Sequence, residues 1–247
     1  MVRWLLLLCL LVIPAQSWAA VANDGTAIVT DTDHFDDGIL NLTGKTTAGS
    51  DRCEIVHVGY EGTVPVTATA TSNGVAMTLV VQHEVAGTAA GDIGAMIFRS
   101  PAGTEPGTAS HNVVVTFDAN VSRAIGAVSS YSGCDRSGTF NSVTGSGTTN
   151  PSLTVSTGVG ADTMVVDAFI LDDAATVGAN QTQVLNLLSA IGGDYLGVGS
   201  YQDGADAGAM TWTASSSAWV GVAVNIPATG GAPPAEIFGF YKRKGPQ

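Results

Sequence analysis

The densest acidic stretch of the chain has the residue types that a cation site needs. It contains Asp31, Asp33, Asp36 and Asp37, followed by Gly38. Alternating carboxylates before a glycine resemble the oxygen donors with which proteins bind Ca²⁺. An EF-hand loop that began at Asp31 would end in a glutamate, however, and Leu42 stands at that position. The stretch is therefore either a calcium site or a solvated turn between strands, and no other cofactor is indicated.

The remaining carboxylates, serines and histidines show no catalytic spacing. Glycoside hydrolysis needs two carboxylates about 5 to 10 Å apart across the scissile bond. Glu54 and Glu61 lie on or beside one predicted strand, whereas the other glutamates are scattered. Ser146 lies between two glycines but lacks the leading elbow of a nucleophilic serine, and the four histidines form no metal-binding pair. No catalytic, cofactor-binding or metal-ligating residue is assigned.

Two tryptophans are candidates for carbohydrate recognition, which uses exposed aromatic rings as platforms. Trp219 lies on the opposite face of its predicted strand from Val220 and Val222, so it is either a ligand platform or a core residue. Trp212 repeats the position of Phe117 in an earlier stretch of similar sequence, which predicts a core position instead. Trp219 is therefore the candidate ligand platform.

Cys53 and Cys134 are the two cysteines that follow the N-terminal apolar run. An exported chain meets an oxidising compartment, where an even cysteine count permits one disulfide. Such a bridge would close a loop of about 80 residues and stabilise the fold by up to roughly 4 to 5 kcal/mol. The alternative is a pair of buried thiols, because Cys53 shares the alternating phase of Ile55.

The apolar pattern that must position these residues is that of strands. Apolar and polar residues alternate from end to end, and no window of about 12 residues has helical spacing with caps. The chain is therefore predicted to be nearly all β, although Val184–Leu188 also fits a helical turn. The predicted strands are 26–30, 39–43, 52–60, 64–69, 76–82, 93–99, 112–117, 123–131, 152–156, 163–171, 183–188, 195–201, 209–213 and 218–226.

Part of this strand pattern occurs twice. Phe117 and Gly126 in the first copy correspond to Trp212 and Gly221 in the second, since 212 − 117 and 221 − 126 both equal 95. Further upstream, 91–96 corresponds to 193–198 at an offset of 102, and 51–55 to 162–166 at an offset of 111. The shrinking offsets place longer connections in the first copy, within 100–110.

Two such copies, packed face to face, predict a two-sheet antiparallel β-sandwich with internal pseudo-duplication. Gly126 and Gly221 fall at equivalent points on the face opposite the apolar residues. A glycine inside a strand usually marks a bulge or the close approach of another chain segment. We therefore expect a packing constraint at both positions, with a ligand site as the alternative.

Several segments resemble a group of secreted and phage-associated bacterial β-sandwich modules that are jelly-roll-like and mostly uncharacterised. The segments that carry the resemblance are Asp51-Arg52, Gly74–Leu79, Pro101–Thr104, Val113–Phe117, Tyr131–Asp135 and Trp219–Pro227. They span about residues 24 to 227. The resemblance implies a jelly-roll-like fold in a surface protein, a tail fibre or a polysaccharide-active enzyme. This chain departs from the pattern of those modules by having a cysteine, Cys134, in the serine-glycine-X-aspartate turn.

The two ends of the chain read differently from the middle. Arg3 followed by an apolar run too short to span a bilayer predicts a signal peptide at 1–19, with cleavage after Ala22 as the alternative to Ala19. Residues 20–227 then form the β-sandwich domain. Residues 228–247 are a Gly/Pro-rich linker and an aromatic-basic tail, which is either a simple extension or a segment that docks on a partner or a membrane surface.

The 247-residue chain carries a net charge of −12 with only nine lysines and arginines, which argues against a nucleic-acid partner. The mature chain has no apolar run long enough for a transmembrane segment. We expect a secreted, extracellular or cell-surface protein, with the periplasm as an alternative location. Its expected function is non-enzymatic surface binding or a structural or adhesive role, with an extracellular glycan or copies of itself as partner. The alternatives are a jelly-roll-type polysaccharide hydrolase or lyase, and a self-assembling filament or virion subunit.

Overall fold

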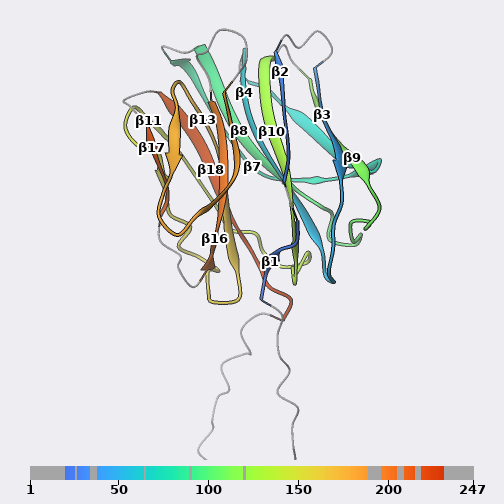
Figure 1. The fold of residues 1–247 in the computed structure, drawn as a ribbon. Coiled ribbons are helices and arrows are strands. Elements are labelled where there is room, and N and C mark those ends of the chain that lie inside the picture. Colours follow the sequence, from blue (N-terminus) through green and yellow to red (C-terminus); the bar gives the residue numbers. More distant parts are fainter. Residues whose placement is uncertain are drawn as a thin grey trace, which may run out of the picture.

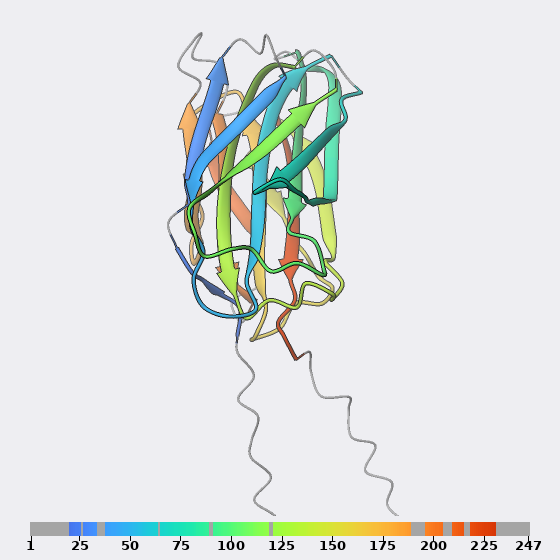
Figure 2. The same cartoon turned by 90° about the vertical axis from the view of Figure 1, so that its right-hand side faces the viewer.

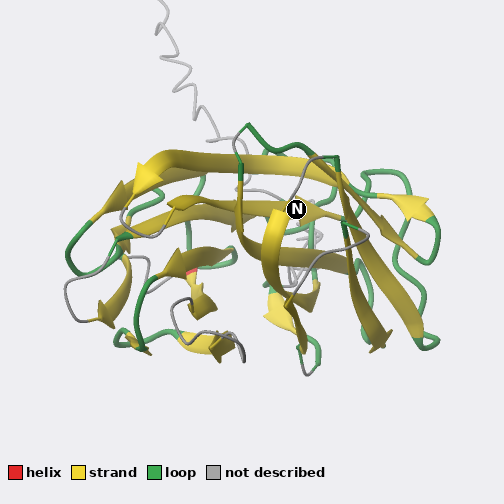
Figure 3. Ribbon diagram, turned by 90° about the horizontal axis from the view of Figure 1, so that it is seen from above, coloured by secondary structure: helices red, strands yellow, loops and turns green. Residues whose placement is uncertain are grey.

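A computed structural model describes residues 20–25, 27–33, 38–63, 65–88, 91–118, 121–188, 196–204, 209–214 and 218–230. The described chain is strand and loop almost throughout (Figure 3), which confirms the all-β prediction. Nothing in these ranges is a helix with the length and hydropathy that a membrane span requires. The predicted signal peptide and residues 231–247 of the tail lie outside the described residues.

The strands form four antiparallel sheets, which corrects the expectation of two. Inner sheet I contains β1 (Ala22–Asn23), β2 (Ile28–Asp33), β10 (Val121–Ser132), β4 (Cys53–Gly62), β8 (Gly91–Arg99) and β7 (Thr78–Thr88). Outer sheet I contains β3 (Ile39–Lys45), β9 (His111–Phe117), β5 (Ala68–Ser72) and β6 (Val75–Ala76). Inner sheet II contains β11 (Ser142–Gly147), β18 (Trp219–Ile226), β13 (Met164–Leu171), β16 (Leu196–Asp203) and β15 (Thr182–Leu188). Outer sheet II contains β12 (Ser152–Leu153), β17 (Met210–Ala214) and β14 (Ala175–Val177).

The four sheets stack as layers, with the two inner sheets face to face at the centre. Figure 1 shows the first-half strands on the right and the second-half strands on the left, and Figure 2 shows outer sheet I crossing over inner sheet I. One apolar core joins the inner sheets, where Ile55 and Ile97 share a cluster with Val222. A second core lies under outer sheet I, and a third lies under outer sheet II. Each half therefore buries a sheet face within itself as well as against the other half.

The two halves share a strand order and a register. The order β2-β10-β4-β8-β7 in inner sheet I corresponds to β11-β18-β13-β16-β15 in inner sheet II. Gly126 pairs with Val58 in the first half, and Gly221 pairs with Phe169 in the second. Gly221 lies 95 residues after Gly126, and Phe169 lies 111 residues after Val58. The pairing of β4 with β8 and of β13 with β16 preserves the offsets of 111 and 102. The offsets found in the sequence therefore relate paired residues in space.

The two interior glycines mark close packing, as predicted for the fold. A Cβ atom at Gly126 would lie 2.6 Å from Leu40 Cδ2, which belongs to outer sheet I. A Cβ atom at Gly221 would overlap the ring of Phe169, on the neighbouring strand. Different neighbours thus require glycine at the same position of both halves.

The observed strands differ from the predicted ones in several places. Strands β1, β11 and β14 were not predicted, and the predicted 76–82 strand is divided at Met77, where the chain passes from outer to inner sheet I. The predicted 64–69 strand lies at Ala68–Ser72 instead. The segment that fitted either a strand or a helical turn is strand β15. The connection between β8 and β9 is the longer one, as expected from the offsets.

The first and last described segments meet at one end of the molecule. Ala22 pairs with Ser132 of β10, and the main chain of Ala228 forms a bridge with Cys134. Cys134 is joined to Cys53, with an S–S distance of 2.12 Å and Cα atoms 6.0 Å apart. The predicted cysteine pair thus lies at bonding distance, and it fixes β4 and the turn after β10 where both ends of the domain emerge.

Candidate functional site

Trp219 does not form the exposed platform that was considered for it. Only 7% of the residue is exposed, and its indole packs edge-on against Phe169 with ring centroids 5.7 Å apart. The ring also lies beside Gly145 and Gly147 of β11, where the absence of side chains leaves room for it. The face of β18 opposite Val220 is therefore covered rather than open to solvent, and Trp219 belongs to the core under outer sheet II.

Trp212 occupies the core, as its match with Phe117 predicted. It is 1% exposed, and its Nε1 donates a hydrogen bond of 3.1 Å to Asp167 Oδ2. Phe117 is likewise buried in the core of the first half. The two aromatic residues thus hold equivalent packing positions in the two copies.

The acidic stretch considered for calcium is only partly described. Asp31 and Asp33 pair through their main chains with Ile125 and Arg123 of β10, whereas Asp36 and Asp37 lie outside the described residues. Within the described ranges, no group of three or more His, Cys, Asp or Glu side chains converges as a metal site would require. The calcium hypothesis stays a prediction.

Asp167 is the centre of a buried polar cluster in the second half. Its Oδ1 accepts a hydrogen bond from Ser200 N at 2.5 Å, and its Oδ2 accepts bonds from Ser200 Oγ at 2.9 Å and from Trp212. Burial raises the pKa of the carboxyl to about 7, against the opposing effect of these donors. Gln181 extends the cluster by donating to Ser200 Oγ at 2.8 Å. The cluster joins inner sheet II to the β14–β15 turn.

Glu54 is the centre of a second buried polar cluster, which lies in the first half. Its Oε1 lies 2.6 Å from His111 Nε2, and its Oε2 accepts a hydrogen bond of 2.5 Å from Ser72 Oγ. His111 is held in turn by the main-chain oxygen of Ala109, 2.8 Å from Nδ1. Lys45 is 1% exposed nearby, and burial lowers its pKa. Carboxylate, imidazole and hydroxyl are therefore together but enclosed, so they stabilise the fold and do not face a substrate.

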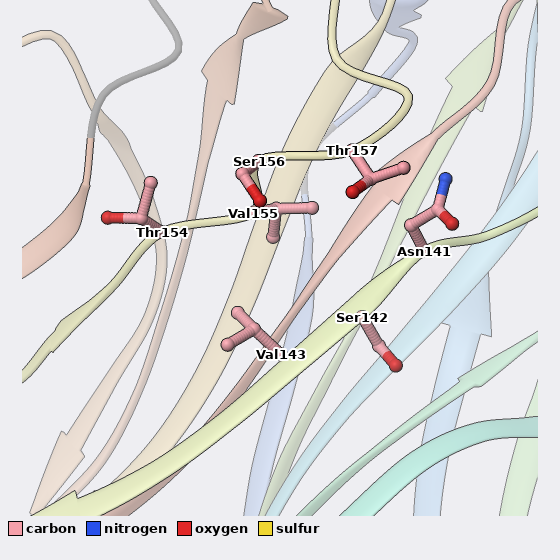
Figure 4. A pocket seen from close by; sticks show the side chains of 7 residues that line it. All are labelled: Asn141, Ser142, Val143, Thr154, Val155, Ser156 and Thr157. Carbon is pink, nitrogen blue, oxygen red and sulfur yellow. The ribbon is translucent and has the colours of Figure 1, made fainter.

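A surface groove with a different chemistry lies at the edge of inner sheet II. Its volume is about 190 Å³. One wall is formed by Asn141 and the start of β11, and the other by the segment that follows β12 (Figure 4). Its lining residues are Asn141, Ser142, Val143, Thr154, Val155, Ser156 and Thr157. None of these seven side chains carries a charge.

The groove has an apolar base and a polar rim. Val155 is 5% exposed, and both Val155 and the half-buried Val143 belong to the core under outer sheet II. In Figure 4 the side chains of Asn141 and Val143 extend toward the opposite wall. The rim carries the hydroxyl groups of Thr154, Ser156 and Thr157 and the side-chain amide of Asn141, whereas Ser142 extends away from the opposite wall (Figure 4). Within the described part of the chain, none of these four rim groups has a hydrogen-bond partner. They are free to bind water or a ligand.

Asn225 holds the two walls together from beneath. It is 1% exposed on β18, where its Oδ1 accepts a hydrogen bond of 2.5 Å from Asn141 N and its Nδ2 donates one of 2.9 Å to Gly158 O. A further main-chain bond of 3.0 Å runs from Asn225 N to Asn141 O. The groove is therefore built on a buried side chain and not formed by two loops that merely lie close together.

No residue pattern in the sequence points directly to this groove. Strand β11 was missed because Ser142–Gly147 consists of small residues and has only one apolar side chain in its alternating pattern. The signal that was available is the pair of Ser/Thr-rich segments on either side of Pro151. No protein-family model and no curated protein matches the sequence, and no solved structure matches the fold.

Proposed function

We propose that the protein is an exported, non-enzymatic, jelly-roll-like β-sandwich that recognises a glycan-bearing surface through the groove between β11 and the segment after β12. The observation that carries this proposal is the groove itself, where uncommitted hydroxyl and amide groups surround an apolar base. Sugars present hydroxyl groups around an apolar C–H face, so such a lining is complementary to them. The lining is mainly polar, with two valines at its base, which suits a hydroxyl-rich ligand better than an apolar one.

The arrangement of the sheets supports the jelly-roll part of the proposal. In the first half, the segment β2-β10-β4-β8 of the six-stranded inner sheet I faces the four-stranded outer sheet I, β3-β9-β5-β6. Strands that follow one another along the chain alternate between these two sheets, as in a double-sheet jelly roll. The cysteine pair supports export, because structural disulfides persist in oxidising compartments. Both ends of the domain emerge at one end of the molecule, which suits a protein held at that end.

The groove favours binding over hydrolysis. Hydrolysis would need two carboxylates across the bound sugar, and no carboxylate is among the residues that line this groove. The carboxylates of Asp167 and Glu54 are 0% exposed and committed to hydrogen bonds inside the fold.

A glycan array probed with the purified mature chain tests the proposal. The variant Thr154→Val/Thr157→Val removes two rim hydroxyls, and Thr43→Val/Thr116→Val removes two exposed hydroxyls from outer sheet I as a matched control. We expect array signal from the wild type and the control, and a loss of at least fivefold in the groove variant. A folded wild type that binds no glycan, or a groove variant that binds as well as the control, would contradict the proposal.

Self-association is a second candidate because one edge strand is unguarded. Among the described strands, β15 pairs with β16 alone, and Thr182–Leu188 contains neither a charged residue nor a proline. Such an edge can pair with a second copy. Electron microscopy and light scattering of the mature chain, with Asn186→Lys as the edge-blocking variant, would show assemblies that the lysine abolishes. A wild type that stays monomeric at high concentration would exclude this candidate.

A further inference from the structure

We infer that the groove takes a single neutral sugar unit and that Asn225 is the positioning residue that fixes its two walls; this inference rests on the proposed function. The ligand class follows from charge. The groove offers no cation to an acidic sugar, and the chain as a whole carries a net charge of −12. Uronic, sialic or sulfated units would meet repulsion without a compensating partner.

The size of the groove sets the number of sugar units. Its volume of about 190 Å³ lies below the range of roughly 300 to 1,000 Å³ that is usual for drug-sized ligands. One ring fits such a space, with its C–H face on Val143 and Val155 and its hydroxyls toward Asn141 and Thr157. A longer glycan would therefore be bound at one unit, with the neighbouring units outside the groove.

The role of Asn225 follows from its two opposite hydrogen-bonding functions. Its carbonyl oxygen must accept from Asn141 N, and its amide must donate to Gly158 O. Only a side chain with both functions in this orientation can hold both walls. Gly158 has a φ of +73°, and a Cβ atom there would overlap the side-chain amide of Asn141, so the second wall lies directly against the first.

The first half of the molecule shows what the absence of this clamp means. The position equivalent to Asn225 is Ser130, since 130 + 95 = 225. Ser130 Oγ is buried and has no hydrogen-bond partner among the described residues. The serine is too short to bridge two segments as the asparagine does. The clamp is therefore a feature that distinguishes the second half from the first.

The test uses Asn225→Asp and two sets of probes. Neutral probes are oligosaccharides of dextran and galactomannan, and acidic probes are oligogalacturonates, with affinities measured by calorimetry at pH 8 and pH 4.5. We expect wild type to bind a neutral probe at both pH values and to bind no acidic probe. In the variant the introduced carboxylate would repel Gly158 O at pH 8 and weaken binding at least tenfold. Burial at this position should raise the pKa of the introduced carboxyl above its ordinary value of about 4. At pH 4.5 the protonated carboxyl can then donate as the amide did, so binding should recover.

Each other outcome contradicts a definite part of the inference. Binding to acidic probes alone would overturn the neutral class while leaving glycan recognition standing, whereas binding to none of the probes or of the arrayed glycans would remove the proposed function itself. Equal affinity of Asn225→Asp and wild type at pH 8 would overturn the positioning role. If Asn225→Asp does not fold at pH 8, Thr157→Val replaces it as the test of the site, because that exposed hydroxyl has no hydrogen-bond partner among the described residues. Its affinity for the neutral probe should fall at least fivefold, and an unchanged affinity would overturn the site.

Discussion

His57 and Asp167 meet across the central interface, where His57 Nδ1 lies 2.7 Å from the main-chain oxygen of Asp167. A main-chain oxygen only accepts, so Nδ1 carries the proton, and Nε2 of the neutral imidazole accepts from Ser129 Oγ at 2.8 Å. Burial lowers the pKa of His57 to about 4, whereas burial raises that of the Asp167 side chain to about 7. Two buried groups with opposite pKa shifts thus lie next to each other, one on β4 and one on β13.

We expect the stability effects of these two groups to oppose each other between about pH 4 and pH 6.5. Below pH 6.5 His57 is protonated in the unfolded chain but stays neutral in the folded protein down to about pH 4. The contribution of His57 to the free energy of unfolding therefore rises with pH in this window. Asp167 stays protonated up to about pH 7 in the folded protein but ionises above pH 3.8 in the unfolded chain. The contribution of Asp167 to the free energy of unfolding therefore falls as the pH rises. Each slope is on the order of 1 kcal/mol per pH unit.

Denaturant unfolding of Asp167→Asn and His57→Gln at pH 4.5, 5.5 and 6.5 separates the two effects. Relative to wild type, the free energy of unfolding of Asp167→Asn should rise with pH and that of His57→Gln should fall. Asp118→Asn is the control, because its exposed carboxyl has a pKa lowered by hydrogen bonds from Thr67 and stays ionised in this range. Parallel pH curves for wild type and both buried variants would show that neither group is shifted as described.

Gly221→Ala and Gly126→Ala should each destabilise the protein. The new methyl group would overlap Phe169 in the first variant and lie 2.6 Å from Leu40 Cδ2 in the second. Overpacking of this kind costs about 1 to 3 kcal/mol. Gly103→Ala and Gly107→Ala are matched controls, because nothing lies within 4 Å of a Cβ atom at either position. Thermal melting measures the difference, and equal melting temperatures for all four variants would contradict the packing argument.

The repeated pattern was readable in the sequence because the packing constraint acts on both copies. Phe117 and Trp212, like Gly126 and Gly221, recur at a fixed offset, and the offset gave the strand pairing. The position of Trp219 was not readable in the same way. The alternation along β18 correctly placed Trp219 on the face opposite Val220. Alternation within one strand does not reveal, however, that outer sheet II covers this face. The groove depends on contacts between Asn225 and segments about 67 and 84 residues away, for which the sequence carries no local signal.

Removal of the cysteine pair should lower stability without changing the architecture. The bridge joins residues 81 positions apart, and the loss of such a native disulfide typically costs about 2 to 5 kcal/mol. Cys53→Ala/Cys134→Ala should therefore unfold at a lower denaturant concentration than wild type. A reductant should bring wild type to the level of the variant and leave the variant unchanged. Two free thiols titrated in oxidised, unfolded wild type would show that the bridge does not form.

Trp219→Ala distinguishes a core role from the platform that the sequence first suggested. Removal of this buried indole should destabilise the protein by about 3 to 5 kcal/mol, because its contacts with Phe169 and β11 would be replaced by a cavity. Trp219→Phe should recover much of that loss. Glycan affinity per folded molecule should change little in Trp219→Phe, since the ring lies beneath Gly145 and Gly147 and does not line the groove. A variant that keeps its melting temperature but loses binding would instead identify Trp219 as a contact residue.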